Sequence, residues 1–284
     1  FAYVRHMIGD KALHCFDQMQ INGIPPDATT FHCSLKACIC IQMADEDQLE
    51  RNNRVASFPN YAIQDQHLRT YDAIEKGQEL HMEIVKIGIE LDVVVGSAIV
   101  DMYCKCKSLK NGRKVFEGMR GQNLVSWNAI ISGHVQYRED CSALELFQQM
   151  QLQGVEPNHV TLSSILKAYS NLGDINNSKL VHDRIVRSGA EIDAILVCTL
   201  VDVYAKCGSL KESCWAFNRL PYRNVAAWAA LISGYAYHGH TLHSLRLFQE
   251  MQEEGLKPDK VTYLCVLNAA SLLNAAEDGN FIHD

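Results

Sequence analysis

The sequence predicts an all-α protein, an α-solenoid superhelix of stacked two-helix repeats. Three observations support this fold class. The segment VDMYCKCKSLKNGRKVF at 100–116 returns as VDVYAKCGSLKESCWAF at 201–217, a spacing of 101 residues that recurs along the chain. Apolar residues inside each copy follow helical spacing. Hydrophobic residues make up 48% of the 284 residues, which is enough to bury a continuous core.

The period of 101 residues divides into segments of 35, 35 and 31 residues, each long enough for two helices. The chain starts and stops inside a repeat, so we expect it to be a fragment of a longer protein. The predicted repeats, in chain order, are 1–27 (partial), 28–92, 93–123, 124–158, 159–193, 194–224, 225–259 and 260–284 (partial).

The repeat at 28–92 is longer than its counterparts. ALHCFDQM at 12–19 and ALELFQQM at 143–150 are 131 residues apart instead of 101, and His81 is already in register. The extra thirty residues therefore lie near 43–72, a polar stretch without a sustained apolar period. Such composition predicts a poorly ordered loop that bulges from the repeat.

The repeat at 124–158 illustrates the expected helix pair. The first helix begins near Ser126, and the second has apolar residues at helical spacing over 143–150. Gly154 and Pro157 then predict its end, because glycine favours the C-terminal cap and proline cannot continue a helix. Thr161 predicts the N-cap of the next helix, and Thr30 and Thr262 stand in the same place.

Composition narrows the classes of function. The net charge of −7 argues against binding nucleic acid through bulk electrostatics, although it does not exclude a local binding stripe. No apolar run is long enough to cross a membrane. The eleven cysteines form no C-x-x-C pair, which favours small, buried, reduced core residues and no metal site. We expect no cofactor.

Two periodic features favour packing over chemistry. His81, His182 and His283 are spaced by 101 residues, and His81-Met82-Glu83 matches the first half of the zinc deaminase signature. Without a following C-x-x-C, a structural histidine of each second helix is the better interpretation. Trp127 and Trp228 begin first helices beside Ile or Leu, so we expect core packing rather than base stacking.

The repeat lengths alternate, and the chain carries the motifs SWNAIISG, LVDVYAKCGSL and ALELFQQM, with the endings GVEPN and GLKPD. In these features the sequence resembles the pentatricopeptide repeat family. More narrowly, it resembles the plant subclass in which three repeat lengths alternate, known as the PLS subclass. The resemblance covers the chain except for the inserted residues. It implies single-stranded RNA as partner, with one base per repeat.

In the family, the fifth and the last residue of a repeat meet the edge of a base, and second residues of successive repeats sandwich it. Ser97 with Asn123, beside Val94, resembles the adenine combination. Asn128 with Asn158, beside Val125, resembles the pyrimidine combination. The resemblance therefore implies a local target of A followed by a pyrimidine. Without it, these would be ordinary polar residues of a solvated face.

The other repeats depart from the pattern. Cys198 is paired with Asn224, and a thiol is a poor reader of a base edge. Ala229 is paired with Asp259, so only the acid could discriminate. The middle-length repeats pair His32 with Asp92 and Ser163 with Asp193, and we assign no base to them.

The resemblance implies sequence-specific RNA binding in a mitochondrion or chloroplast, for RNA processing or C-to-U editing. The chain itself is expected to have no catalytic residue, and any deaminase domain would lie outside it. RNA-editing factors or a deaminase-bearing protein are further expected partners. The alternative is a peptide-binding scaffold of tetratricopeptide type, although the W-x2-L-G-x2-Y pattern of that class is absent.

Overall fold

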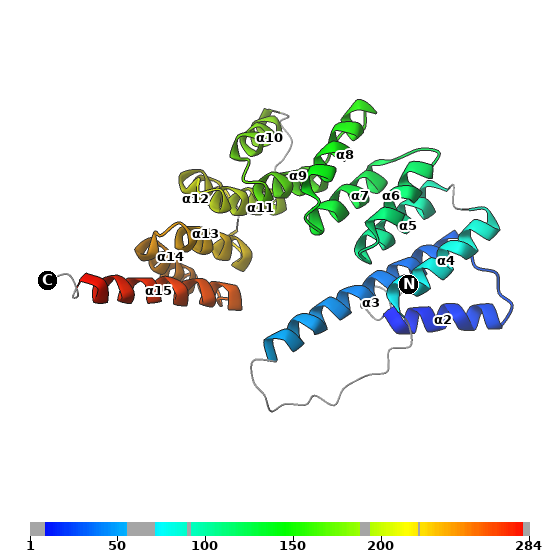
Figure 1. Cartoon of the computed structure of the whole chain (residues 1–284), viewed down its shortest axis with the longest axis horizontal. Coiled ribbons are helices and arrows are strands. Elements are labelled where there is room, and N and C mark those ends of the chain that lie inside the picture. The colour runs from blue at the N-terminus through cyan, green and yellow to red at the C-terminus, as the bar shows by residue number, and fades with distance from the viewer. Residues whose placement is uncertain (1–8, 56–71, 90–91, 188–193, 221, 281–284) are drawn as a thin grey trace. The chain divides into compact units, whose positions relative to one another are not determined.

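The computed structural model describes residues 9–55, 72–89, 92–187, 194–220 and 222–280. The regular elements in these ranges are all α-helices, paired and stacked, which confirms the predicted all-α solenoid fold class (Figure 1). The chain divides into two compact units, Phe1–Glu156 and Pro157–Asp284.

The first unit is built around α3, α5 and α7, which pack side by side in this order. A second set of helices packs against them: α2 and α4 against α3, α6 against α5 and α7, and α8 against α7. The helices are α2 (Gly9–Ile21), α3 (Ala28–Val55), α4 (Ala73–Ile87), α5 (Val93–Lys105), α6 (Leu109–Gly118), α7 (Leu124–Gln136) and α8 (Asp140–Leu152).

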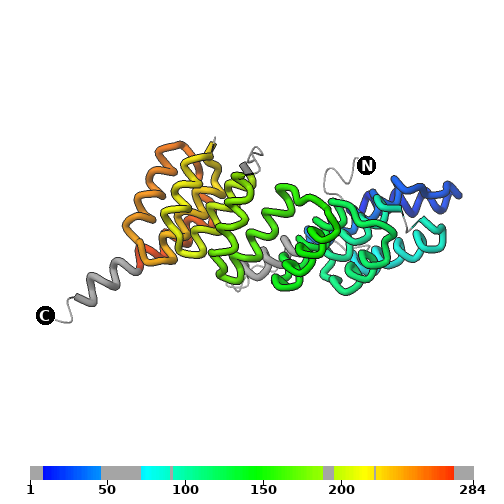
Figure 2. The backbone as a smooth tube through the Cα atoms, turned by 90° about the horizontal axis from the view of Figure 1, so that it is seen from above, coloured from blue at the N-terminus to red at the C-terminus, as the bar shows by residue number. Residues whose placement is uncertain are grey.

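The second unit repeats this plan. The first helices α9, α11, α13 and α15 pack in sequence, and α10, α12 and α14 pack against them. Figure 2 shows the yellow and orange helices of this unit side by side. The helices are α9 (His159–Asn171), α10 (Ile175–Arg187), α11 (Ala194–Lys206), α12 (Leu210–Phe217), α13 (Val225–Tyr237), α14 (Thr241–Glu253) and α15 (Lys260–Asn280).

The N-caps of these first helices stand three residues before the threonines that the sequence singled out. Asn158 is the N-cap of α9, and its side chain accepts a hydrogen bond from the Thr161 backbone N–H at 3.1 Å. Thr161 Oγ1 in turn accepts from the backbone N–H of Asn158, which completes a capping box. The prediction that Thr161 is the N-cap is therefore wrong: it is the third helical residue of a reciprocal cap. Asp27 with Thr30 repeats both bonds, whereas Asp259 accepts from both the backbone N–H and the hydroxyl of Thr262.

Glycine ends the second helix of the repeat at 124–158, as predicted. Gly154 follows the last turn of α8 with φ at +72°, a left-handed conformation that costs a residue with a Cβ more than glycine. Its backbone N–H donates to the carbonyl of Gln151. The chain then leaves the helix axis just before Pro157.

The insertion is only partly a loop. Residues 43–55 continue α3 as helix, so the prediction of an irregular loop is wrong for them. This stretch has no glycine or proline, and Ala, Glu, Gln, Leu and Arg favour the helix that already begins at Ala28. Residues 56–71 lie outside the described residues. Ala73 then starts α4, with Asp72 as N-cap.

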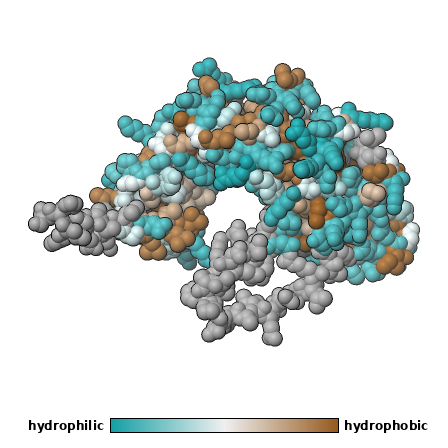
Figure 3. Space-filling view, viewed as in Figure 1, coloured by the Kyte–Doolittle hydropathy of each residue, from teal (hydrophilic) through white to brown (hydrophobic). Residues whose placement is uncertain are grey.

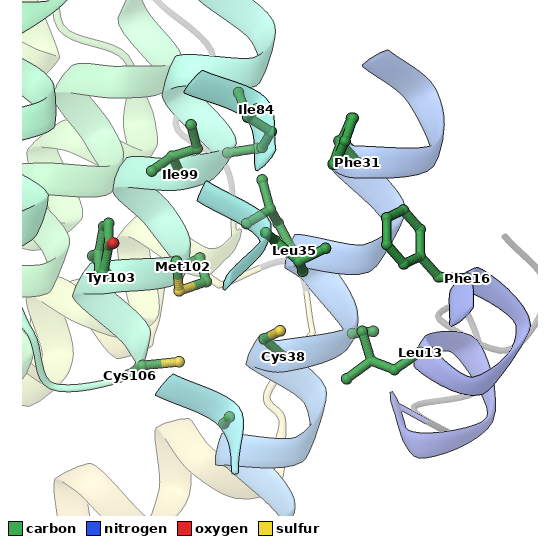
Figure 4. Packing of buried hydrophobic residues seen from close by; sticks show 14 of the residues in the cluster. Leu13, Phe16, Phe31, Leu35, Cys38, Ile84, Ile99, Met102, Tyr103 and Cys106 are labelled. Carbon is green, nitrogen blue, oxygen red and sulfur yellow. The ribbon is translucent and has the colours of Figure 1, made fainter. Parts of the chain in front are cut away.

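The core of the first unit lies between neighbouring helices. In Figure 4, Leu13 and Phe16 of α2 point toward Cys38 and Leu35 of α3, whose other side faces Met102 of α5. Most of these side chains are fully buried, so each helix of the stack buries apolar surface on two flanks. Burial of this kind stabilises by about 25 cal/mol per Å² of apolar surface.

The periodic aromatic residues pack as predicted. Trp127 and Trp228 are each 1% exposed and meet Phe116 and Phe217 edge-on, with ring centroids 4.6 and 4.7 Å apart. They are core residues in both copies. Trp228 Nε1 also donates to Glu254, whereas Trp127 Nε1 has no partner in the part of the chain that the structure describes.

The periodic histidines lie on second helices, also as predicted. His81 Nδ1 lies 2.9 Å from the Tyr103 hydroxyl, and His182 Nδ1 lies 2.7 Å from that of Tyr204. The same bond therefore ties a second helix to the next first helix in both copies. His283 lies outside the described residues.

Cysteines follow the prediction in part. All eleven are free thiols, and Cys38, Cys40, Cys104 and Cys106 are buried. Cys15 and Cys141 are exposed, because they lie on the solvent side of α2 and α8, so the prediction of burial is wrong for them.

Across the described helices, none has the length and hydropathy needed to cross a bilayer.

α15 exposes apolar side chains that its counterpart α9 buries. Leu267 is 64% exposed, whereas Leu166, at the same place in α9, is fully buried. Tyr263 and Leu264 are exposed beside it, and Figure 3 shows hydrophobic surface next to the grey C-terminal segment. In α9 this place in the repeat is therefore a packing surface.

Candidate nucleic-acid interface

An exposed aliphatic side chain marks the second residue of most first helices. Val94, Val125 and Ile195 are between 60% and 67% exposed, and Val160 and Val261 follow the same rule at 42% and 56%. Each stands in the first turn, as the second helical residue. Since the first helices pack side by side within each unit, these side chains recur from one layer of a unit to the next.

In the repeats whose last residue is described, that residue caps the first helix of the next repeat. Asn123 Oδ1 accepts from the Ser126 N–H at 2.9 Å, and Asn224 Oδ1 accepts from the Ala227 N–H at 2.8 Å. Asp92 accepts from two backbone N–H groups of α5. The cap fixes one oxygen of each side chain and leaves the other amide or carboxylate atom for a further contact.

In both short repeats, the fifth and last residues meet. Ser97 Oγ lies 3.3 Å from Asn123 Oδ1, and Cys198 Sγ lies 3.7 Å from Asn224 Nδ2. The partners are 26 residues apart in sequence, so the fold of the repeat brings them together. The pairs that the family resemblance selected in these two repeats therefore each form one local polar site.

The two members of such a pair differ in accessibility. Ser97 is only 3% exposed, and its hydroxyl donates to the Val93 carbonyl at 2.6 Å. Asn123 is half-buried, and its Nδ2 has no partner among the described residues. A ligand approaching this repeat therefore meets the amide of Asn123 before it meets the hydroxyl of Ser97.

The other predicted pairs are placed as follows. Asn128 is a half-buried residue of α7 in the first unit, and Asn158 caps α9 in the second. Ala229 is 9% exposed and offers no polar atom, whereas Asp259 is exposed and caps α15 through Oδ1. Only the acid of this last pair can recognise a base edge.

The middle-length repeats present a different environment. His32 Nδ1 is buried without a hydrogen-bond partner among the described residues, and burial lowers the pKa of this imidazole, with nearby Lys36 acting in the same direction. Neutral His32 is therefore the form favoured at pH 7. Ser163 Oγ is also buried, and Asp193 lies outside the described residues.

Sequence reasoning missed that the last residue of a repeat is also a helix cap. The signal was available: Asn or Asp stands three residues before Ser or Thr at 123–126, 158–161 and 259–262. This spacing is the one that a reciprocal cap requires.

Family models match most of the regular repeats. The PPR repeat family model matches residues 122–171 and 223–271, and a PPR repeat model matches 97–124 and 195–225. The chain belongs to the pentatricopeptide repeat family. Both models are in register with the helix pairs described above.

Curated relatives agree with this family. The pentatricopeptide repeat-containing protein At5g27110 of Arabidopsis thaliana is 32% identical over 96% of this chain and 35% of its own length. At1g11290 from the same plant, named chloroplastic, is 33% identical over 96% of the chain and 30% of its own length. The chain thus spans about a third of these relatives.

Solved structures agree with the fold. The pentatricopeptide repeat protein PPR10 from maize has a TM-score of 0.65 and 20% identity, over 99% of this chain and 41% of PPR10. PPR10 in complex with an 18-nt psaJ RNA element has a TM-score of 0.62, over 92% of this chain and 40% of PPR10.

Proposed function

We propose that this pentatricopeptide repeat chain binds single-stranded RNA in a sequence-specific manner, with one base addressed by each repeat. The observation that supports this most is the site at the start of each first helix. There, Ser97 lies one helix turn after the exposed aliphatic residue Val94 of α5, and its hydroxyl lies 3.3 Å from Asn123, the cap of α7.

The chemistry of this site suits an unstacked base. Aliphatic side chains of neighbouring repeats, such as Val94 and Val125, offer apolar surface to the two faces of a ring. Contacts of aromatic side chains with bases are worth about 1–3 kcal/mol each, and an aliphatic sandwich replaces part of that stacking. A capping amide held by its oxygen presents its N–H₂ group to acceptors on the base edge.

We assign adenine to the repeat with Ser97 and Asn123, and a pyrimidine to the repeat with Asn128 and Asn158. The repeat with Cys198 and Asn224 and the repeat with Ala229 and Asp259 contribute a single discriminating side chain each. The expected local target is A followed by a pyrimidine, read from 5′ to 3′ along the chain.

We further propose that the chain is the recognition array of a PLS-type protein that acts in RNA processing or C-to-U editing. The alternation of 35, 35 and 31 residues supports the subclass, with repeats bounded as predicted from the sequence. A plant organelle is the proposed location, since relatives such as At1g11290 are named chloroplastic. In this role the chain positions RNA and performs no catalysis, and a deaminase or editing factor would supply the chemistry.

The test is selection from a randomised single-stranded RNA pool on the chain and on Asn128→Thr. We expect the unaltered chain to enrich A-pyrimidine, and Asn128→Thr to shift the second base toward a purine. The matched control is Asn176→Thr on the exposed side of α10, which should leave the preference unchanged.

Binding should also weaken as salt is added, because phosphate contacts release counterions. If no sequence is enriched and Asn128→Thr changes nothing, the code assignment fails. If no RNA binds at all, a peptide-binding scaffold of tetratricopeptide type becomes the better hypothesis.

A further inference from the structure

A second surface of the molecule has the features of a binding site, away from the first turns that form the proposed RNA site. It lies in the second unit between α10 and α12, which both pack against α11 (Figure 1). Two adjoining hollows open there, with volumes of about 510 and 210 Å³. His182 of α10 and Trp215 of α12 line both of them.

The smaller hollow has an apolar floor and polar groups at its rim. Val197 and Leu200 of α11 and Ala216 of α12 are buried and form its floor. Val186, which is 52% exposed, lines it from α10. An engineered cavity of about 150 Å³ lined by apolar residues binds benzene, so this hollow has room for one bulky apolar side chain.

Among the described residues that line the smaller hollow, Arg219 is the one with a permanent positive charge. Its guanidinium lies 4.3 Å from the centroid of the Trp215 ring, which holds the charge beside the hollow. Charged side chains line the larger hollow, and across it Lys179 of α10 pairs with Glu212 of α12 at 2.8 Å. An apolar recess next to a fixed guanidinium favours an apolar group that is followed by a carboxylate.

The scaffold of this site is repeated, but its binding features are not. In the first copy, 101 residues earlier, the hydrogen bond between His81 and Tyr103 is kept. Lys114 stands in the place of Trp215, and Gly118 stands in the place of Arg219. The fold of the repeat therefore does not require Trp215 or Arg219. Yet Trp215 is 47% exposed, and Trp and Arg are enriched where proteins bind one another.

The geometry does not suit nucleic acid. A base needs an open aromatic face on which to stack. Arg219 covers the Trp215 ring at 4.3 Å, and the His182 ring lies 5.7 Å from it at a tilt of 59°. In addition, Asp183 and Glu212 offset the charges of Lys179 and Lys211 in the larger hollow, so it offers no net positive charge to a phosphate chain.

We propose that the α10–α12 hollow docks a protein partner through a short segment that inserts one bulky apolar side chain and sets a neighbouring carboxylate against Arg219. The residues of the proposed RNA site in this unit, such as Ile195, Cys198 and Asn224, line neither hollow. The chain can therefore hold this partner and RNA at the same time.

The test selects phage-displayed random 12-residue peptides on the whole chain, with counter-selection on Trp215→Lys. This substitution places in the second copy the residue that the first copy already has, so the fold is expected to persist, and a thermal melt checks it. We expect enriched peptides to share a bulky apolar residue beside Asp or Glu.

The leading peptide, synthesised with a fluorophore, then reports affinity by anisotropy. Trp215→Lys should weaken its binding at least about tenfold, as loss of a central tryptophan does at other interfaces. Lys114→Ala in the first copy is the matched control and should have no effect. Arg219→Glu should weaken binding too, and replacing the peptide carboxylate by Lys should restore it on that variant.

Three results would overturn the proposal. In the first, no peptide is enriched over the counter-selection, or the leading peptide binds Trp215→Lys as well as the unaltered chain. In the second, Trp215→Lys lowers affinity for an RNA oligonucleotide instead, which would assign the hollow to nucleic acid. In the third, sedimentation shows self-association that Trp215→Lys abolishes, which would assign it to a second copy of the chain.

Discussion

Replacing Gly234 by alanine should separate two first helices that the fold holds at very short distance. Gly234 of α13 faces Ala205 of α11. A Cβ added there would lie 2.5 Å from Ala205 Cβ and 3.0 Å from Ala205 Cα. Carbon atoms in contact normally lie about 3.5–4.0 Å apart, so α13 would have to move outward by about 1 Å.

The expected loss follows from two opposing effects. Overpacking a tight contact destabilises a core by about 1–3 kcal/mol, and the obstacle here includes backbone, which cannot change rotamer. Alanine gains up to about 1 kcal/mol over glycine through helix propensity. With overpacking at the upper end, Gly234→Ala should lower the free energy of unfolding by about 2 kcal/mol. Gly133 is the equivalent residue of α7, and a Cβ added there would lie 2.6 Å from Cys104 Cβ. Gly133→Ala should therefore destabilise the chain in the same way.

Urea denaturation followed by circular dichroism measures the effect, and hydrogen exchange of α11 and α13 amides localises it. Gly118→Ala is the control, because a Cβ on this last residue of α6 meets nothing within 4 Å. It should be neutral or slightly stabilising. Combining Gly234→Ala with Ala205→Gly should recover part of the loss. If Gly234→Ala unfolds at the same urea concentration as the unaltered chain, the close helix contact does not determine stability.

Three further outcomes are expected from urea denaturation. Trp228→Phe should cost about 1–2 kcal/mol more than Trp127→Phe, because Trp228 alone loses a hydrogen bond; equal losses would contradict this. Asn123→Ala should cost about 1 kcal/mol through the lost cap, whereas Asn123→Asp should keep stability, since Asp caps equally well. Burial lowers the pKa of His134 and His182. The unfolded chain therefore binds protons first below about pH 6.5, and stability should fall from pH 7 to pH 5, less steeply in His134→Gln.

The fold could be predicted from the sequence because each layer is a local structure that recurs. The apolar spacing of 143–150 recurs 101 residues later, and Trp127 recurs as Trp228. Both recurrences predict that the same helix pair occurs twice. Agreement between copies removes the ambiguity that one copy alone would leave. The insertion had no second copy, so polarity alone favoured a loop where the chain continues α3.

The candidate site was harder to predict, because side-chain roles depend on which atoms the fold already uses. Position in the repeat identified Ser97 and Asn123, and the fold brings them within 3.3 Å. Sequence position could not indicate that Ser97 is buried against its own helix. Nor could it find the α10–α12 hollow, since Trp215 and Val197 meet only through packing of α12 on α11.

If the last residue of a repeat helps to select a base, as proposed above, its capping role limits how that selection can change. Only Asn, Asp, Ser and Thr both accept a backbone N–H at a helix start and present a second polar group or hydroxyl. A substitution outside this set at Asn123 or Asn224 would weaken the next helix before it altered any choice of base. The residue types available at that position are therefore limited by the need to cap the helix. On the proposed code, the four bases must then be distinguished with the help of the fifth residue. New targets can evolve quickly inside this small set, while most other changes are removed as folding defects.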